Sequence, residues 1–248
     1  IITPSTGSNH ISLKDCKKKG IKVISIKNSK NIKQITASSE FTFAIFLSLI
    51  KKIQKGVETV RAGHWRDMED NLRGYELKDK KVGIIGFGRI GSNIAKYSKA
   101  FKMKVISYDP NIKIKNKSVL QYSSINKILA NSDIIFICVH LNKKTKKMVN
   151  NMWFKHMKKN YFFINTSRGE VVDENALISA IKTKKISGAA VDVVTNEQEI
   201  IKKSNRLIQF SKTNKNLIVT PHIAGLTYES ERKAAITTFN NIKRILNA

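Results

Sequence analysis

Three side chains suited to hydride chemistry stand at or just after the ends of predicted strands: Arg168, Glu197 and His222. The first closes the stretch "YFFINTSRG" (161–169), where a strongly apolar run gives way to small polar residues and then to an arginine. A guanidinium that leaves water is costly unless an anion meets it. We therefore expect either an internal carboxylate or a ligand from outside to pair with Arg168.

The three residue types together fit the interconversion of a 2-hydroxy acid and a 2-keto acid. A guanidinium holds the substrate carboxylate in bidentate fashion and polarises the oxygen on C2. An imidazole exchanges the hydroxyl proton near neutral pH, and a carboxylate beside it orients the ring and favours its charged form. The sequence therefore predicts Arg168, Glu197 and His222 as a catalytic set.

Each of these residues also has a structural interpretation. Arg168 would serve as an internal salt-bridge partner, Glu197 lies in the polar loop "TNEQE", and His222 follows a proline in "TPHIAG", where a buried core histidine is the alternative. The remaining histidines are interpreted as structural or exposed: His10, His64, His140 and His156.

The segment "GFGRIG" contains Gly86, Gly88 and Gly91 with the spacing G-x-G-x-x-G, between a predicted strand and a predicted helix. In dinucleotide-binding proteins the first glycine allows a tight turn, the second lets the backbone approach a pyrophosphate, and the third lets the helix pack closely. The helix N-terminus then offers free N–H groups to the phosphates. A tight turn without a ligand is the alternative interpretation.

Two acidic residues after later strands support cofactor binding. Asp109 ends the strand that follows the glycine segment, where an acid accepts hydrogen bonds from the ribose and repels a 2′-phosphate. NAD is therefore expected in preference to NADP, although Lys113 and Lys115 lie nearby and would soften that preference. Asp192, at the end of "GAAVD", either holds the nicotinamide carboxamide or caps the next turn.

Short apolar, β-rich runs alternate with helical patterns from residue 80 onward. The predicted strands are 80–87, 104–109, 133–141, 161–167, 188–194 and 216–222, and the predicted helices are 89–101, 118–132, 151–158, 172–186 and 230–246. This alternation predicts an α/β fold with a doubly wound parallel sheet, in which reactive groups lie beyond the carboxyl ends of the strands. Before it, 20–26 is predicted as a strand and 39–61 as one long helix that Gly56 bends or ends.

Composition limits the class of protein. The chain has 248 residues, and 46 basic against 18 acidic residues give a formal net charge of +28. Because the lysines are scattered, we interpret most of them as solvated surface rather than a nucleic-acid site. Two distant cysteines, Cys16 and Cys138, provide neither a disulfide framework nor a metal site and fit the cytoplasm. The longest apolar run, 41–50, is too short to span a membrane.

Six stretches match one enzyme family in order along the chain. They are "STGSNHI" (5–11), "ELKDKKVGIIGFGRIG" (76–91), "YDP" (108–110), "NTSRGEVVDENAL" (165–177), "GAAVDV" (188–193) and "TPHIAG" (220–225). On these motifs the chain resembles the D-isomer-specific 2-hydroxyacid dehydrogenases, which include D-3-phosphoglycerate dehydrogenase, glycerate and hydroxypyruvate reductases, and D-lactate dehydrogenase.

The resemblance implies a role for each matching position. It implies Arg168, Glu197 and His222 as the catalytic residues, with Gly7 and Arg168 holding the substrate carboxylate. For NAD it implies contacts, beyond the glycine segment, from Arg89, Ile90, Asp109, Thr166, Ser167, Asp192, Gly225 and Thr6. Substrates of the 3-phosphoglycerate or hydroxypyruvate and glyoxylate type are expected.

The resemblance also implies a division into domains. Residues 1–36 are expected to be the remnant of an incomplete, flavodoxin-like substrate domain whose start is missing before Ile1. Residues 37–77 are expected to form a long helix and arm in a homodimer interface, 78–221 a Rossmann NAD-binding domain, and 222–248 a helix that returns to the substrate domain. The alternatives are a catalytically inactive dinucleotide-binding fragment and a corepressor-like binding protein.

Overall fold

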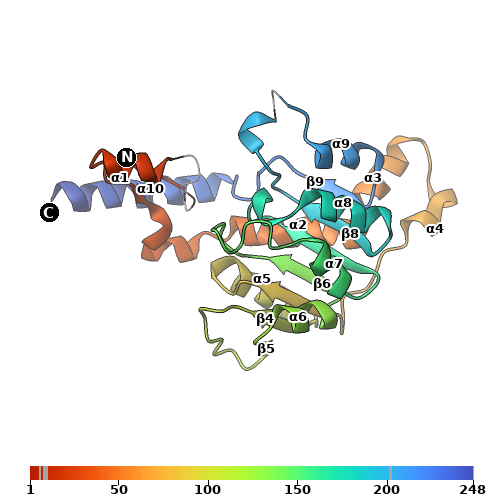
Figure 1. Ribbon diagram of the computed structural model, residues 1–248. Helices are drawn as coiled ribbons and strands as arrows, with labels where there is room; N and C mark the ends of the chain where they lie inside the picture. The colour runs from red at the N-terminus through yellow and green to blue at the C-terminus, as the bar shows by residue number, and fades with distance from the viewer. Residues whose placement is uncertain (6, 8–10, 201–202, 248) are drawn as a thin grey trace. The chain divides into compact units, whose positions relative to one another are not determined.

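The computed structural model describes residues 1–5, 7, 11–200 and 203–247, and the chain forms two compact units (Figure 1). The smaller unit comprises Ile1–Ser38 and Gly225–Ala248, and the larger one Ser39–Ala224. Most residues of the expected site belong to the larger unit.

The larger unit is built on a seven-stranded sheet with the order β5-β4-β3-β6-β7-β8-β9, in which every neighbouring pair is parallel. The strands are β3 (Lys81–Ile85), β4 (Lys104–Tyr108), β5 (Val119–Gln121), β6 (Ile134–Ile137), β7 (Tyr161–Asn165), β8 (Ile186–Val191) and β9 (Leu217–Val219). The order reverses between β3 and β6, where doubly wound sheets open a crevice for ligands. The predicted α/β fold with a doubly wound parallel sheet is confirmed.

The central strands are buried on both faces, which explains their unbroken apolar sequences. In β6, Ile135 and Ile137 pack into one core layer, whereas Ile134 and Phe136 pack into the other, because successive side chains of a strand point to opposite faces. The first layer is covered by α6 (Ile125–Asn131), α7 (Asn151–His156), α8 (Glu174–Lys182) and α9 (Arg206–Thr213), and the second by α2 (Ala37–Ile50) and α5 (Arg89–Ala100).

Helix α2 supplies the aromatic part of the second layer. Phe43 and Phe46 are almost completely buried, and the Phe46 ring meets that of Phe136 edge-on with 5.2 Å between the ring centroids. Each such buried side chain contributes roughly 1.5–3 kcal/mol of hydrophobic stabilisation. The wide apolar surface of α2 is therefore used within the larger unit.

The long helix predicted over 39–61 is interrupted. Helix α2 ends at Ile50, and α3 (Ile53–Arg61) starts after Lys52, whose φ of 54° lies in the left-handed region. A non-glycine residue in this conformation does not propagate a right-handed helix. The expectation that Gly56 bends or ends the helix is wrong, because Gly56 lies inside α3.

Two other segments differ from the sequence-based expectation. The helix predicted over 118–132 contains the short strand β5 before α6, because Val119 pairs with Val105 of β4. Helix α9 was not among the predicted elements. Beyond α3, the chain passes through the short helices η3 (Arg66–Met68) and α4 (Glu69–Leu72) before it enters the sheet.

The smaller unit contains short elements and one long helix. Strands β1 (Ile2–Thr3) and β2 (Ile24–Ser25) pair in parallel, and with them are α1 (Leu13–Lys18), η1 (Ile26–Asn28), η2 (Lys30–Gln34) and α10 (Tyr228–Leu246). Nζ of Lys233 on α10 donates a hydrogen bond of 3.0 Å to the carbonyl oxygen of Gln34. The strand predicted over 20–26 is shorter than expected, since β2 contains only Ile24 and Ser25.

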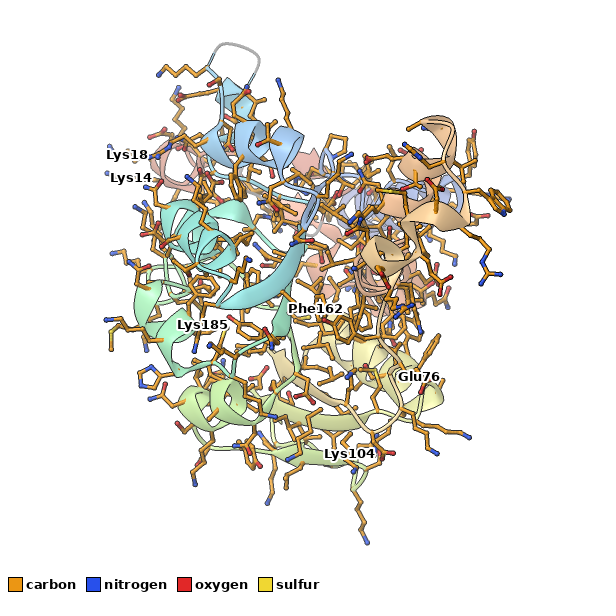
Figure 2. All side chains as sticks on the ribbon, turned by 90° about the vertical axis from the view of Figure 1, so that its right-hand side faces the viewer. Lys14, Lys18, Glu76, Lys104, Phe162 and Lys185 are labelled. Atoms are coloured by element: carbon orange, nitrogen blue, oxygen red, sulfur yellow. The ribbon has the colours of Figure 1, made fainter. Side chains whose placement is uncertain are left out.

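The basic side chains extend from many separate elements, among them Lys104 on β4 and Lys185 before β8 (Figure 2). Lys104 also pairs with Asp79 at 3.2 Å. Within the described part of the chain, no helix combines the length and the apolar character needed to cross a bilayer.

Candidate active site

The turn after β3 has a conformation that requires glycine. Gly86 has a φ of 92°, and a Cβ atom at this position would lie 2.5 Å from the carbonyl oxygen of Cys138. At Gly91 an added Cβ would collide with the carbonyl of Gly86, so α5 packs directly against the turn. Gly88 is different, because no described atom lies within 4 Å of its Cβ position. The turn therefore packs against other backbone atoms at Gly86 and Gly91, whereas Gly88 has free space beside it among the described residues.

Helix α5 starts at this open glycine. Gly88 is its N-cap residue, and the first turn of the described helix carries no acidic side chain. Its free N–H groups and the helix dipole together suit an anion such as a pyrophosphate. Of the two residues that follow, Arg89 is half-buried and burial lowers its pKa, while Ile90 packs at the edge of the second core layer.

Asp109 connects the glycine turn to the loop after β4. One of its carboxylate oxygens accepts a hydrogen bond of 2.8 Å from the backbone N–H of Phe87, and the other accepts from the N–H groups of Asn111 and Ile112 at 2.8 and 3.1 Å. The carboxylate is thereby fixed beside the glycine turn.

The end of β7 presents Arg168 through a buried asparagine. Oδ1 of Asn165 accepts from the backbone N–H of Ser167 at 3.0 Å, and its Nδ2 donates to the carbonyl oxygen of Arg168 at 3.1 Å. The Arg168 guanidinium is half-buried and donates to the carbonyl oxygen of Ser167 at 2.6 Å. Within residues 1–5, 7, 11–200 and 203–247 no carboxylate forms an ion pair with it, so its charge is available to a ligand.

The two hydroxyl residues before Arg168 are held by the chain itself. The Oγ1 atom of Thr166 lies 2.6 Å from Oγ1 of Thr42 on α2, and Oγ of Ser167 donates to Oδ1 of Asn165 at 2.7 Å. These bonds fix the conformation of the loop that follows β7.

Glu197 and His222 are in direct contact. Glu197 begins the short helix η5 (Glu197–Glu199), and its Oε1 accepts from the backbone N–H of Val194 at 3.2 Å. Its Oε2 accepts from Nδ1 of His222 at 2.5 Å. His222 has a φ of 57°, a left-handed conformation that turns the chain sharply after β9. The two residues expected to act together are therefore a hydrogen-bonded pair.

The surroundings of His222 favour its protonated form. The hydrogen bond to Glu197 is the main cause of a raised pKa, and the charges of Glu197 and Asp192 act in the same direction. Partial burial and the positive charge of Arg168 act in the opposite direction. Because 45% of the imidazole remains exposed, the ring is accessible to a reactant.

Asp192 is fully buried and holds the loop that carries His222. Its Oδ1 accepts from Oγ1 of Thr220 at 2.5 Å and from the backbone N–H of Ile223 at 3.0 Å, while Oδ2 accepts from the N–H of Ala224 at 2.7 Å. Of the two interpretations left open by the sequence, these contacts are those of a residue that caps the turn.

Two expected site residues are not part of the larger unit. Gly7 and Gly225 belong to the smaller unit. The N–H of Gly7 donates to Oγ of Ser5 at 3.1 Å, and the carbonyl oxygen of Gly225 accepts from Oγ of Ser230 at 2.5 Å. Thr6 lies outside the described residues.

Three supporting residues were not anticipated: Thr42, Asn165 and Glu174. The Glu174 carboxylate accepts from the backbone N–H of Thr195 at 2.6 Å and from Nδ2 of Asn205 at 3.0 Å, which fixes the loop before Glu197. A polar residue inside an apolar strand was the available signal for Asn165. For Thr42 and Glu174 the partners are distant in sequence, and no local pattern indicates them.

The arrangement can therefore perform acid–base chemistry on an anionic substrate. It combines a guanidinium that pairs with no carboxylate among the described residues, an imidazole with a raised pKa and its carboxylate partner, and a glycine turn at a helix N-terminus. In the sheet these groups follow the carboxyl ends of β3, β7, β8 and β9, the edge at which parallel sheets carry their reactive groups.

Comparisons with known proteins agree on one family. The family described as "D-isomer specific 2-hydroxyacid dehydrogenase, NAD binding domain" matches residues 43–224. Glyoxylate reductase of Thermofilum pendens is 34% identical over 99% of this chain and 71% of its own length. D-3-phosphoglycerate dehydrogenase of Methanocaldococcus jannaschii is 32% identical over 97% of this chain and 44% of its own length. The structure of D-lactate dehydrogenase from Aquifex aeolicus, complexed with NAD and lactic acid, superposes with a TM-score of 0.88 at 33% identity, covering 100% of this chain and 76% of that one.

Proposed function

The chain belongs to the D-isomer-specific 2-hydroxyacid dehydrogenase family, and we propose that it transfers a hydride between C2 of a short D-2-hydroxy acid and NAD, with the 2-keto acid as substrate in reverse. The names of its relatives favour glyoxylate, hydroxypyruvate or 3-phosphoglycerate as the substrate type. The observation that carries the proposal is the His222–Glu197 hydrogen bond beside a guanidinium without a carboxylate partner among the described residues.

In this proposal each catalytic side chain has one task. Arg168 binds the substrate carboxylate and polarises the C2 oxygen. During oxidation Nε2 of His222 takes the hydroxyl proton, and during reduction the imidazolium returns it. Glu197 holds Nδ1, which fixes the ring orientation and stabilises the imidazolium. The nicotinamide, when bound, accepts or supplies the hydride.

The residues around the glycine turn fit a dinucleotide. The empty Cβ position of Gly88 leaves room for a pyrophosphate at the start of α5, next to Arg89 and Ile90. Asp109 would accept the ribose hydroxyls, which favours NAD over NADP. We assign Thr166, Ser167, Asp192, Gly225 and Thr6 to the surroundings of the cofactor, and Gly7 to the substrate carboxylate.

We propose that the smaller unit is part of the substrate domain and that the protein acts as a cytoplasmic homodimer. Support for a dimer comes from α3, where Ile53, Val57 and Val60 share one face and are 44–53% exposed. Such spacing places apolar side chains on a single side of a helix. Sedimentation of the purified protein should give twice the mass of the chain.

The catalytic assignment is tested by Arg168→Ala. We expect kcat/KM for glyoxylate or hydroxypyruvate to fall by about 100-fold or more, because a desolvated charge pair contributes roughly 2–5 kcal/mol. The Kd of NADH should stay within about twofold, since Arg168 is assigned to the substrate. Arg206→Ala, at an exposed position on α9, serves as the matched control. Full turnover by Arg168→Ala, or NADH binding without turnover of any keto acid by the wild type, would contradict the proposal.

A further inference from the structure

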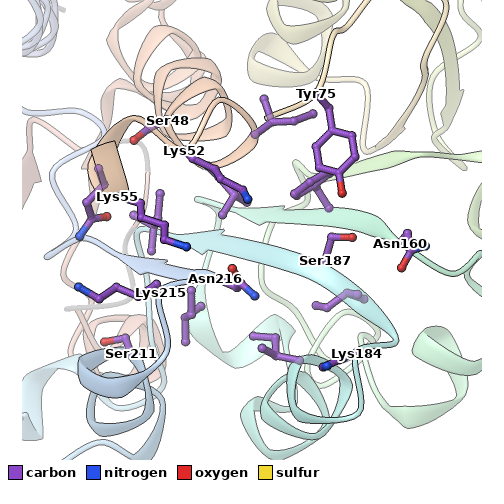
Figure 3. A pocket seen from close by; sticks show the side chains of 18 of the residues that line it. Ser48, Lys52, Lys55, Tyr75, Asn160, Lys184, Ser187, Ser211, Lys215 and Asn216 are labelled. Carbon is purple, nitrogen blue, oxygen red and sulfur yellow. The ribbon is translucent and has the colours of Figure 1, made fainter. Parts of the chain in front are cut away.

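A cavity of about 330 Å³ lies in the larger unit at the amino-terminal edge of the sheet (Figure 3). Its floor contains the first residues of β8 and β9, and its wall is the junction between α2 and α3. We call it the amino-edge pocket. Its volume lies in the range of small-molecule sites rather than of a single trapped ion.

The amino-edge pocket is separate from the candidate active site. It is lined by Ile186, the first residue of β8, whereas Asp192 of the active site follows the last residue, Val191. Ile186 and Val191 lie roughly 17 Å apart along an extended strand. A ligand in the pocket would therefore occupy neither the dinucleotide site nor the catalytic residues.

The lining of the pocket carries a strong excess of positive charge. Five lysines line it, and Glu58 is the single acid among the described lining residues. Glu58 already pairs with Lys215, and this bond is the main cause of the lowered pKa of its carboxyl group. The other lysines that line the pocket are Lys52, Lys55, Lys184 and Lys212.

Two of these ammonium groups are held close together. Nζ of Lys52 and Nζ of Lys55 both donate to the carbonyl oxygen of Asn71, at 3.1 and 2.9 Å. Each ammonium has three N–H donors, so two on each remain for another acceptor. Burial and the neighbouring charge of Lys55 lower the pKa of Lys52, as expected for a cation that no anion yet compensates.

Helix α3 turns its charged side inward. Lys52, Lys55 and Glu58 are half-buried, while the apolar face of Ile53, Val57 and Val60 is exposed. At 100° per residue Lys55 and Glu58 lie on the side of the helix opposite this apolar face, and Lys52 directly precedes the helix. A second copy of the chain that covers the apolar face would therefore leave the amino-edge pocket open.

We propose that the amino-edge pocket binds a small organic phosphate, with Lys52 and Lys55 on the phosphoryl group and the apolar floor on the organic part. A phosphoryl group brings close to two negative charges and three acceptor oxygens, which several separate ammonium groups can share. A planar carboxylate is matched better by the fork of an arginine, and the pocket is lined by lysines. In Figure 3, Lys52 and Lys55 extend into the pocket from its helical wall, and Asn216 and Ser187, which also line it, offer further hydrogen bonds.

The test is calorimetric titration of the full chain with phenyl phosphate, in saturating NADH so that the dinucleotide site is filled. We expect Lys52→Gln/Lys55→Gln to weaken binding at least tenfold. The control Lys14→Gln/Lys18→Gln removes the same charge from exposed positions on α1 (labelled in Figure 2) and should bind within twofold of the wild type. Equal affinity in the two double variants, or no binding to the wild type, would overturn the proposal.

Further probes separate the chemistry from simple charge attraction. Benzoate, of similar size but with one charge, should bind at least tenfold more weakly than phenyl phosphate, and equal binding would refute phosphoryl recognition. If the double variant does not fold, Lys184→Gln, on the opposite wall, should lower the affinity at least threefold. An unchanged affinity of this variant would then count against the pocket. Turnover of keto acids is measured separately, so its failure does not affect this result.

Discussion

Nδ1 of His222 lies 2.5 Å from Oε2 of Glu197, although the two residues are 25 positions apart in the sequence. Because a carboxylate only accepts hydrogen bonds, Nδ1 carries the hydrogen, and Nε2 is left to exchange a proton with a reactant. The same contact raises the pKa of the imidazole. Orientation and acidity of the ring thus depend on one carboxylate.

Glu197→Gln should shift the pH dependence of turnover toward acid. The glutamine can still accept a hydrogen bond but no longer supplies the negative charge, so the pKa of His222 falls. Keto-acid reduction requires the imidazolium and should lose activity at a lower pH than in the wild type. Oxidation requires the neutral ring and should begin at a lower pH. Profiles of kcat/KM in both directions measure this, and coincident profiles would exclude the assigned role of Glu197.

Asp192→Asn should loosen the loop that carries His222. The amide has one acceptor oxygen where the buried carboxylate has two, so a backbone N–H of Ile223 or Ala224 loses its partner. We expect a decrease of roughly 1–3 kcal/mol in the free energy of unfolding, measured with urea. In Asp173→Asn, at the N-cap of α8, the asparagine can replace the capping oxygen, and stability should hardly change. Equal stability of the two variants would rule out this role of Asp192.

Gly86→Ala should lower stability, whereas Gly88→Ala should weaken NADH binding. Gly86→Ala forces a left-handed alanine against the Cys138 carbonyl and should lower the free energy of unfolding by roughly 2 kcal/mol or more. Gly88→Ala meets no described atom within 4 Å, so it should fold normally but weaken NADH binding at least tenfold, because the methyl group fills the place of the pyrophosphate. Thermal unfolding and NADH fluorescence titration distinguish the two effects. Tight NADH binding by Gly88→Ala would contradict this placement of the cofactor.

Asp109→Asn should change the choice between the two nicotinamide cofactors. The amide oxygen can still accept from the N–H of Phe87, but the charge that repels a 2′-phosphate is gone. We expect the Kd of NADPH to fall at least tenfold while that of NADH rises only a few-fold. Direct titration with both cofactors is the measurement. An unchanged ratio would mean that Asp109 does not face the ribose.

The α/β fold could be predicted from the sequence because short stretches of residues indicate its strands and its glycine turn. Unbroken apolar runs such as 161–164 indicate strands buried on both faces, and the glycine spacing indicates the turn after β3. The parallel sheet, the family and NAD as cofactor are confirmed. The break at Lys52 was missed because a lysine carries no marker of a left-handed backbone. The strand β5 was missed because three residues are too few to show a period.

The sequence predicted which residue types form the candidate site, but not most of the hydrogen bonds that hold them in place. Arginine, glutamate and histidine at strand ends were sufficient to predict the pairing of Glu197 with His222 as a hypothesis of mechanism. The turn-capping contacts of Asp192 could only be left as one of two alternatives, because its partners Thr220 and Ala224 follow a different strand. The half-buried Lys55 and Glu58 of α3 contradict ordinary amphipathic patterning, which predicts that the apolar face is buried and the charged face exposed.

The pairing of β9 with β8 fixes where the His222 side chain lies. Val191 pairs with Val219, and three residues later the imidazole reaches Glu197. Insertions or deletions between Thr213 and Asn216, in the surface connection before β9, leave that count intact. Removal of a single residue between Val219 and His222 would displace the ring by one step of the backbone. Natural or engineered versions of this chain should therefore differ in length between Thr213 and Asn216 but not between Val219 and His222.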